Sequence, residues 1–427
     1  MLKLNLDNLL FPLSFLEVKY WYNIKKAMKW IHEKYNNKSL WFADLDENNH
    51  IEKIEKFVSD NKWKYDNVVV LWIWWSALGA RAILTALKWK YYNSLPKSKR
   101  NWNPRLHILD NVDPIEIRDL KEVLDYKKTL FIVISKSWRT LETISQFQFF
   151  KNELESNNLN YEDHFVIIAW EESSFKDESL KKWLTVFDIP CNVWWRFSVF
   201  TNVWLLPLAL VWIDIRLLLK WVSNVKNEYL SDNFLENKAL LASLIQYHSY
   251  RELWKNITVF FPYIWNFTYV GAWLKQLVWE SLWKAWTGVT LADSIWVTDQ
   301  HSQLQLYYDW PNDKLIIFLE LEDFWVDYSI TRDEKISFSN LMHTEKYWTE
   351  KSITEYNKIN YTIKLDKLNE ESIWELFLFF EFQIAILWEL YNFNAFDQPW
   401  VEIWKEITNQ KLKDNIWKIE LLEWIIN

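Results

Sequence analysis

The sequence predicts an α/β protein with parallel-rich sheets, built as two α/β units. In the first half, four short apolar runs are bounded by polar residues, as buried strands are. Segments with a helical pattern separate these runs, and the same alternation resumes after residue 240. Strands that alternate with helices form parallel sheets with helices on both faces. The predicted strands are residues 67–73, 105–110, 129–137, 164–169, 256–261 and 313–321.

This pattern divides the chain into four segments. Residues 1–60 form a helical lead-in, and residues 61–225 form the first α/β domain. Residues 226–395 form the second α/β domain, and residues 396–427 form a helical C-terminal segment. A helical region around LPLALVWIDIRLLLK joins the two domains.

Composition indicates a soluble, cytoplasmic protein. The 427 residues carry a net charge of −8, which favours solubility and disfavours a nucleic-acid surface. The single cysteine, Cys191, excludes an intrachain disulfide and suits a reducing compartment. The N-terminus shows no secretion signal, because acids interrupt its apolar run. The longest apolar run, Val203 to Ile213, is shorter than the roughly 20 residues that span a bilayer, so we expect no membrane partner.

The tryptophan and glycine contents are abnormal. The chain has 33 Trp and 3 Gly, whereas average usage predicts roughly 30 glycines at this length. Trp also stands where turns need glycine, as in LWIWWSALGA (71–80), VWWRFS (193–198) and DWPNDK (309–314). We therefore interpret most of these tryptophans as glycines, encoded by UGA codons that mean glycine but were translated as tryptophan.

The alternative is a chain that is truly rich in tryptophan. The codons of Trp72, Trp74 and Trp75 would decide between the two, since UGG codons there would exclude recoding and suggest a non-functional reading frame. Trp273, within a predicted helix, is our candidate for a genuine tryptophan.

Two turns carry the features of phosphate-binding sites. Read with glycine, LWIWWSALGA is a strand, a Gly-rich turn and a helix that starts at Ser76, which directs backbone N–H groups at an anion. ISKSWRTLET (134–143) follows another strand and combines hydroxyls with Lys136 and Arg139, a set that suits a phosphate monoester. A tight turn without ligand, or a helix cap with solvated basic residues, remains the alternative.

Six motifs in order make the chain resemble the glucose-6-phosphate isomerase family. They are the two turns above, VWWRFS, QLVWESLWK (276–284), TDQHSQLQL (298–306) and FDQPWVEIWK (396–405). The first two resemble the family's glycine-rich turn and phosphate loop, and the others its Gly-Gly-Arg, Glu-Ser-x-Gly-Lys, histidine and C-terminal segments. Ser137 replaces the family's usual Thr and keeps the hydroxyl, while Arg139 departs from the commonest eukaryotic form.

The resemblance implies the fold and the chemistry. The fold is two sugar-isomerase (SIS-type) three-layer units, with the site in a cleft between them. Glu280 is the base that moves a proton between neighbouring carbons, and Arg196 stabilises the enediolate. His301 and Lys405 open the sugar ring. The implied substrate- and phosphate-binding residues are Ser76, Ser135, Lys136, Ser137, Thr140, Gln276 and Gln398.

Each of these side chains also has an ordinary structural interpretation. Taken alone, Glu280 could be a surface glutamate, Arg196 an ion-pair partner, His301 a structural histidine and Lys405 a solvated lysine. Proton shuttling through an enediol requires neither a metal nor a cofactor, and we expect none.

The resemblance also implies a partner and leaves rival functions. The substrates are glucose 6-phosphate and fructose 6-phosphate, and the family implies a homodimer in which His301 reaches the partner's site. The alternatives are a bifunctional glucose/mannose phosphate isomerase and a sugar-phosphate-binding protein of the same fold without turnover. The joint presence of Glu280, His301 and Lys405 argues against the second alternative.

Overall fold

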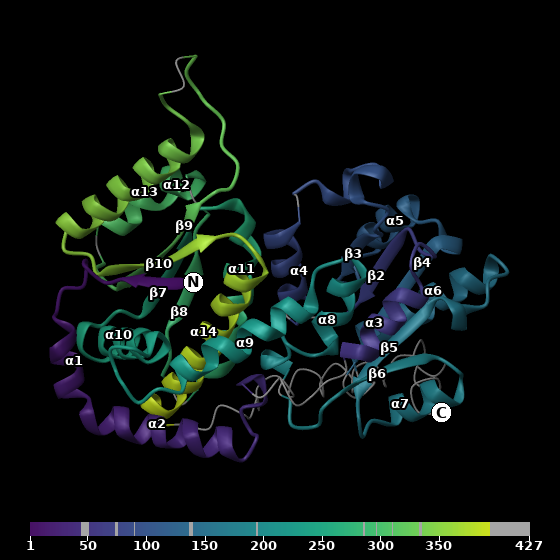
Figure 1. The fold of residues 1–427 in the computed structure, drawn as a ribbon, viewed down its shortest axis with the longest axis horizontal. Coiled ribbons are helices and arrows are strands. Elements are labelled where there is room, and N and C mark those ends of the chain that lie inside the picture. Colours follow the sequence, from purple (N-terminus) through teal and green to yellow (C-terminus); the bar gives the residue numbers. More distant parts are fainter. Residues whose placement is uncertain are drawn as a thin grey trace, which may run out of the picture. The chain divides into compact units, whose positions relative to one another are not determined.

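The computed structural model describes most of the chain in two compact units, which we treat separately (Figure 1). The described residues are 1–43, 51–72, 76–88, 90–135, 140–193, 195–284, 287–295, 297–309, 311–332 and 335–392; for Ser76, Ala77, Trp195 and residues 222–224 only the backbone is described. Unit 1 comprises the described residues within Met1–Lys62, Trp75–Asn103 and Trp195–Phe393. Unit 2 comprises those within Trp63–Trp74 and Pro104–Trp194.

Unit 2 is built on a parallel sheet of five strands in the order β3-β2-β4-β5-β6. One face of the sheet packs against three helices through residues such as Phe131, Phe150 and Phe165. The strands are β2 (Asn67–Leu71), β3 (Arg105–Leu109), β4 (Thr129–Ile134), β5 (Phe165–Trp170) and β6 (Thr185–Ile189), and the helices are α5 (Pro114–Val123), α6 (Leu141–Ser156) and α7 (Ser174–Lys181).

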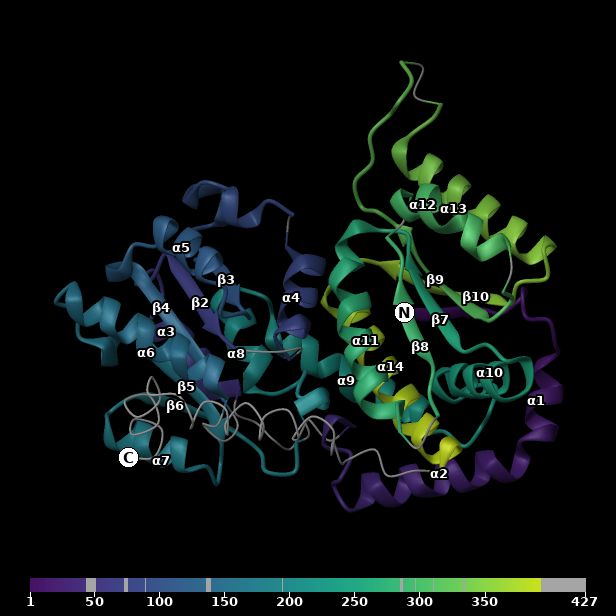
Figure 2. The same ribbon diagram turned by 180° about the vertical axis from the view of Figure 1, so that it is seen from behind.

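Unit 1 contains a second sheet, in the order β1-β10-β9-β7-β8, with helices on both faces (Figures 1 and 2). Only β1, at one edge, is antiparallel to its neighbour. The strands are β1 (Leu2–Asn5), β7 (Ile257–Pro262), β8 (Thr290–Asp293), β9 (Lys314–Asp323) and β10 (Asn360–Lys367). Helices α12 (Thr298–Tyr308) and α13 (Phe338–Glu355) cover one face, and α10 (Lys238–Leu253), α11 (Thr268–Leu282) and α14 (Glu370–Tyr391) cover the other.

The remaining elements of the described chain are helices and single turns of 3₁₀ helix. The α-helices are α1 (Leu13–Lys19), α2 (Trp21–Asn36), α3 (Ile51–Asp60), α4 (Ser76–Leu87), α8 (Asn202–Leu210) and α9 (Ile215–Tyr229). The 3₁₀ turns are η1 (Trp41–Ala43), η2 (Tyr92–Ser94), η3 (Lys97–Arg100), η4 (Tyr126–Lys128), η5 (Tyr161–Asp163), η6 (Trp195–Phe197) and η7 (Trp265–Phe267).

The predicted fold class is confirmed, and each of the six predicted strands is present. The compact units, however, are discontinuous in sequence, whereas the boundaries expected at 61–225 and 226–395 are continuous. The structure also adds four strands that the sequence did not reveal, because they are short or only half-apolar. One of these is β1, which precedes the helices of the expected N-terminal lead-in.

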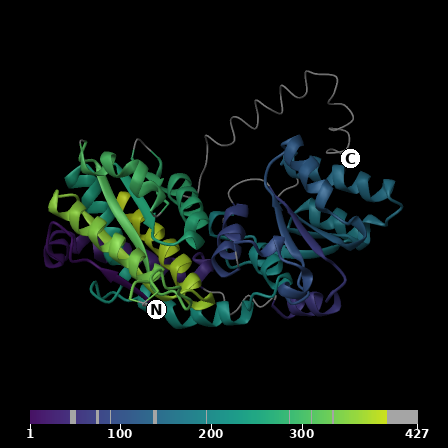
Figure 3. The ribbon, with the colours of Figure 1, turned by 90° about the horizontal axis from the view of Figure 1, so that it is seen from above.

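Helix α14, drawn in yellow in Figure 3, is buried almost throughout its length according to the exposure of its residues. From Ser372 to Tyr391, every residue except Glu389 is buried, and α14 packs against α2, α9, α10 and α11. A helix that is apolar all round belongs inside a protein. Burial raises the pKa of Glu381, at the middle of this helix, well above its usual range, which favours its protonated form. Within the described ranges, no helix combines the length and apolar character needed to cross a membrane.

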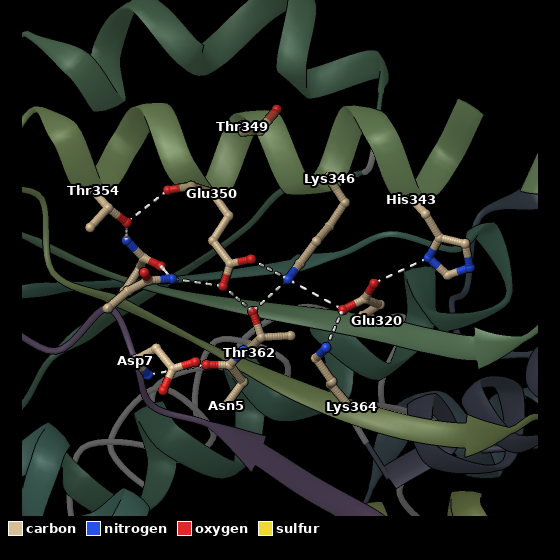
Figure 4. Close-up of polar contacts among 12 residues, drawn as sticks. Asn5, Asp7, Glu320, His343, Lys346, Thr349, Glu350, Thr354, Thr362 and Lys364 are labelled. Atoms are coloured by element: carbon tan, nitrogen blue, oxygen red, sulfur yellow. Dashed lines mark hydrogen bonds and ion pairs between the residues drawn. The ribbon is translucent and has the colours of Figure 1, made fainter. Parts of the chain in front are cut away.

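A network of buried charges fixes α13 to the strands beneath it (Figure 4). The ammonium of Lys346, whose side chain is 3% exposed, lies 2.5 Å from Glu350 Oε2 and donates to Thr362 Oγ1 at 2.8 Å. Glu320 on β9 accepts a hydrogen bond from His343 Nδ1 at 3.1 Å. Its other oxygen forms ion pairs with the ammonium groups of Lys346 and Lys364, at 3.3 and 3.5 Å.

The partners of Glu320 lower its pKa by more than burial raises it. Burial alone would raise the pKa of this carboxyl, but the hydrogen bond from His343 and the charges of Lys346 and Lys364 lower it to about 2. A lowered carboxyl pKa stabilises the folded state above the ordinary pKa of 4.5, and this contribution disappears as the pH falls through about 2.

We predict that Glu320→Gln lowers the free energy of unfolding by about 3 kcal/mol at pH 7, since it removes a negative charge that faces the buried ammonium of Lys346 and the partly buried ammonium of Lys364. The deficit should shrink between pH 4.5 and 2, because over that window the carboxyl of the unfolded wild-type chain becomes protonated while that of the folded chain stays ionised. Urea unfolding at pH 7 and pH 3 measures both values. Glu322→Gln is the matched control on the same strand: its partner Lys3 is exposed, and the expected change is below about 1 kcal/mol. If Glu320→Gln lowers the free energy of unfolding by the same amount at both pH values, the folded-state pKa of Glu320 is not lowered as described.

Candidate active site

Helix α11 carries the candidate base and is tightly attached to the sheet of unit 1. Gly271 allows the close approach, since a Cβ at this position would lie 3.1 Å from Asp293 Cβ and 3.3 Å from Phe260 Cδ1. One turn further on, Lys275 Nζ forms an ion pair with Asp293 Oδ1 at 2.9 Å. Because α11 contacts β7 and β8 at these points, the groups on its last two turns have a defined position.

Two of the predicted site residues lie one turn apart on α11. Residues four apart in a helix lie on the same face. Gln276 Nε2 donates a hydrogen bond to Glu280 Oε1 at 3.3 Å. Gln276 is buried, whereas the side chain of Glu280 retains 20% exposure. The carboxylate is therefore held by a buried amide and still has access to solvent.

Arg196, on the 3₁₀ turn η6, joins the same group. Its side chain is 3% exposed, and its Nη1 donates a hydrogen bond to the backbone carbonyl of Glu280. Its Nε lies 4.0 Å from Glu280 Oε2. A carboxylate that can accept a proton thus stands beside a fixed cation that can stabilise negative charge on a bound molecule.

His301 lies on α12, and its side chain is exposed. Neighbouring glutamines hold this helix: Gln300 accepts a hydrogen bond from the Tyr263 hydroxyl at 3.3 Å, and Gln303 accepts one from the Ser294 hydroxyl at 3.3 Å. Among the described residues, no hydrogen bond joins the His301 imidazole to Glu280 or to Arg196. Within the described residues, His301 is therefore not part of the hydrogen-bonded group formed by Gln276, Glu280 and Arg196.

The predicted phosphate loop begins in unit 2, at the end of β4. Ser135 is buried, and its backbone N–H donates to the Ile168 carbonyl at 3.1 Å. Thr140 precedes α6 as its N-cap, yet its hydroxyl makes no capping hydrogen bond. Such a residue leaves the first N–H groups of a helix available to other acceptors.

The structure does not describe the side chains of the other predicted site residues. Ser76 begins α4, but its side chain lies outside the description. Lys136, Ser137, Gln398 and Lys405 lie wholly outside the described residues. Sequence reasoning missed the bond from Gln276 to Glu280, although the spacing of four residues within a predicted helix was available to indicate it.

The chain is similar in sequence to known proteins of one family. The sequence profile of the family described as phosphoglucose isomerase matches residues 48–298. The chain is 35% identical over 387 residues to the glucose-6-phosphate isomerase of Methanocaldococcus jannaschii, a match that covers 89% of this chain and 92% of that protein. It is also 35% identical over 378 residues to the glucose-6-phosphate isomerase of Carboxydothermus hydrogenoformans, which covers 84% and 81% of the two chains.

Two solved structures share the fold. A hypothetical protein from Thermus thermophilus superposes with a TM-score of 0.86 at 27% identity, covering 96% of this chain and 100% of the other. A glucose-6-phosphate isomerase from Chlamydia trachomatis superposes with a TM-score of 0.76 at 20% identity, covering 87% and 75%. Since the profile spans more than half of the sequence and both sequence relatives exceed 30% identity over most of their length, this chain belongs to the phosphoglucose isomerase family.

Proposed function

We propose that this chain interconverts glucose 6-phosphate and fructose 6-phosphate; two of its relatives are named glucose-6-phosphate isomerase. The observation that carries the proposal is the pairing of the Glu280 carboxylate with the buried Arg196 guanidinium. Moving a carbonyl between C1 and C2 needs one group that takes and returns a proton, and one that stabilises the oxyanion formed meanwhile. Glu280 and Arg196 supply these two groups.

The remaining residues have supporting roles in the proposed reaction. The sugar enters as a closed ring, and His301 with Lys405 opens it by moving protons on and off the ring oxygen and the C1 hydroxyl. The phosphate monoester binds the segment from Ser135 to Thr140, at the start of α6. Ser76 and Gln398 contribute further polar contacts to the substrate.

We predict that Glu280→Gln lowers kcat by at least about 10² while leaving substrate binding within a few-fold, since the amide keeps the shape but cannot accept the proton. A coupled assay of fructose 6-phosphate and binding of a substrate analogue measure the two quantities. Glu252→Gln is the control, because Glu252 is a solvent-exposed glutamate that pairs with Lys19 on α1. If the Glu280→Gln enzyme keeps more than a tenth of normal kcat, Glu280 is not the base.

We also propose a cytoplasmic homodimer in which His301 acts in the partner subunit. The exposure of His301 on α12 supports this arrangement, because a residue that serves a second subunit must face outwards. The exposed free thiol of Cys191 supports a reducing compartment.

We predict that His301→Ala slows turnover of closed-ring glucose 6-phosphate more than proton exchange on an open-chain substrate. Mixing subunits tests the arrangement: a dimer of one Glu280→Gln and one His301→Ala chain contains one intact site only if the histidine acts in trans. Coexpression should then restore about a quarter of wild-type activity, since half of the dimers are mixed and each has one active site of two. Activity no higher than that of the separate variants would exclude action in trans.

Finally, we propose that most tryptophans of this sequence are glycines in the natural protein. Backbone conformation supports this. Among the described non-glycine residues with positive φ, six of eleven are tryptophan and four are asparagine. Left-handed backbone favours glycine and, after it, asparagine, whereas a bulky side chain is disfavoured there. The six tryptophans are Trp63, Trp102, Trp183, Trp212, Trp254 and Trp325, with φ between 50° and 65°.

The surroundings of these six residues give further support. Each is more than half exposed, so that its indole buries little apolar surface. Trp254 ends α10 in the left-handed conformation, with its N–H bonded to the Ser249 carbonyl, a position that glycine usually occupies. Trp273, by contrast, lies within α11 and is 2% exposed, as a genuine tryptophan should be.

We predict that a variant with glycine at all six positions unfolds at a higher temperature than the sequence as written, since relief of left-handed strain is worth about 1–2 kcal/mol per residue. Trp273→Gly is the matched control and should lower stability by about 3–5 kcal/mol, because it empties a buried site. Thermal unfolding measures both variants, and the intact mass of the natural protein gives the residue types directly. A natural mass that corresponds to 33 tryptophans would refute the proposal.

A further inference from the structure

This inference rests on the proposed function and concerns the group that opens the sugar ring. We infer that Tyr307 is a positioning residue for His301: its hydroxyl, bonded to Ser294 and Gln303, fixes α12 on the sheet of unit 1 and thereby places the imidazole. The observation that leads to it is the burial pattern of α12. All residues of this helix are described, and Tyr307 is the one among them that is buried.

The Tyr307 hydroxyl belongs to a small polar network at the end of β8. It is hydrogen-bonded to the hydroxyl of Ser294, the residue that follows β8, and it donates to Gln303 Oε1 at 2.6 Å. Ser294 Oγ lies 3.3 Å from the same oxygen of Gln303. Ser294 is itself fixed, since its backbone N–H donates to the Phe260 carbonyl on β7 at 2.9 Å. The network therefore connects α12 to both β7 and β8.

The ring of Tyr307 adds apolar contacts to this attachment. Tyr307 is 3% exposed and belongs to the buried cluster that includes Val259, Phe261 and Phe318 from β7 and β9. Burial raises the pKa of its hydroxyl to about 12, so that the hydroxyl stays neutral and can donate near pH 7. A buried hydroxyl without a partner costs free energy, so this group favours the position of α12 in which its partners are within reach.

His301 depends on the helix for its position. Its side chain is exposed, and it precedes Tyr307 by six residues, which is about 9 Å along the axis of α12. Two further hydroxyl bonds hold this helix, but they engage side chains of α12 that are only half buried: Gln300 accepts from Tyr263, and Tyr308 is bonded to Ser352 on α13. A buried side chain of α12 takes part only in the connection at Tyr307.

Ring opening depends on where the imidazole lies. In this step the C1 hydroxyl gives up its proton, and the electrons of its O–H bond form the C1 carbonyl. The bond from C1 to the ring oxygen breaks, and that oxygen takes up a proton. A misplacement of a reacting group by about 1 Å can cost about 10² in rate. The later proton transfer between C2 and C1 uses Glu280, so a displaced α12 should slow ring opening selectively.

The test is Tyr307→Phe, which removes the hydroxyl and keeps the buried ring. Two substrates separate the steps: glucose 6-phosphate enters as a ring, whereas 5-deoxyfructose 6-phosphate lacks the hydroxyl that would close one. We expect kcat for glucose 6-phosphate to fall by about tenfold, and exchange of the C1 protons of the open-chain substrate with deuterated water to stay within about twofold. Ser294→Ala breaks the same network from β8 and should have the same selective effect, should Tyr307→Phe fail to fold.

Tyr65→Phe is the matched control. Tyr65 is also buried, at 4% exposure, but its hydroxyl donates to the Asp163 carbonyl in unit 2, at 2.6 Å. Its replacement should leave the ratio of the two rates unchanged, and thermal unfolding checks that each variant is folded. Equal losses on both substrates in Tyr307→Phe would show a merely structural role, and unchanged rates would show no role; both results overturn the inference.

Mixed dimers add a readout that general damage to the chain would not give. When Glu280→Gln and Tyr307→Phe chains are coexpressed, half of the dimers are mixed. With the histidine acting in trans, each mixed dimer has one site with an intact Glu280 and an intact α12. About a quarter of wild-type activity should then return, against about a tenth for Tyr307→Phe alone.

The outcomes separate this inference from the proposed function. If Glu280→Gln complements His301→Ala but not Tyr307→Phe, the inference is overturned. If it complements neither, the histidine does not act in trans, and the ratio of the two rates decides the role of Tyr307. The proposed function fails instead if the wild-type chain does not isomerise glucose 6-phosphate.

Discussion

The burial of α14 is the constraint on which the structure of unit 1 depends. This helix has no polar face to turn towards water, so the surrounding elements must cover it on every side. Helices α2, α9, α10 and α11 do so, although they come from distant parts of the sequence. The position of α11, and with it that of Glu280, follows from packing on both α14 and the sheet.

Three buried or partly buried carboxyl groups of unit 1 follow one rule: each either has a cationic partner or lies where the protonated form is favoured. Two carboxylates of this unit have cationic partners: Glu320 faces two ammonium groups, and Glu280 faces the Arg196 guanidinium. Glu381 is enclosed by α14 and its neighbours, and its burial favours the protonated form. Burying an unpaired charge costs free energy, which explains both the cationic partners of the first two carboxylates and the raised pKa of Glu381. In the candidate site, this rule places a fixed positive charge next to the carboxylate before any substrate arrives.

The sequence predicted an element correctly where one physical requirement, such as burial on both faces of a sheet, determines the residue types. Continuous apolar runs mark β2, β4 and β7, because both faces of a parallel sheet are covered. Strand β1 escaped notice because four residues of alternating character at a sheet edge resemble many loop segments. The pairing of Arg196 with Glu280 joins residues 84 positions apart, so only family resemblance could suggest it. The contacts of Lys346 with Thr362 and Glu320 depend likewise on tertiary packing that no local pattern encodes.

The edge strand β1 has a consequence for synthesis of the chain. Leu2 to Asn5 pair with Thr362 to Leu365, and the Leu2 N–H binds the carboxylate of Glu375. At 5–20 residues per second, a ribosome takes about 20–70 s to reach these partners. During that interval β1 lacks β10, its neighbour in the sheet, and the helices that pack against α14 lack that partner. Unit 1 can therefore close only after α14 has been made, whereas the strands and helices of unit 2 between Asn67 and Ile189 have all emerged long before.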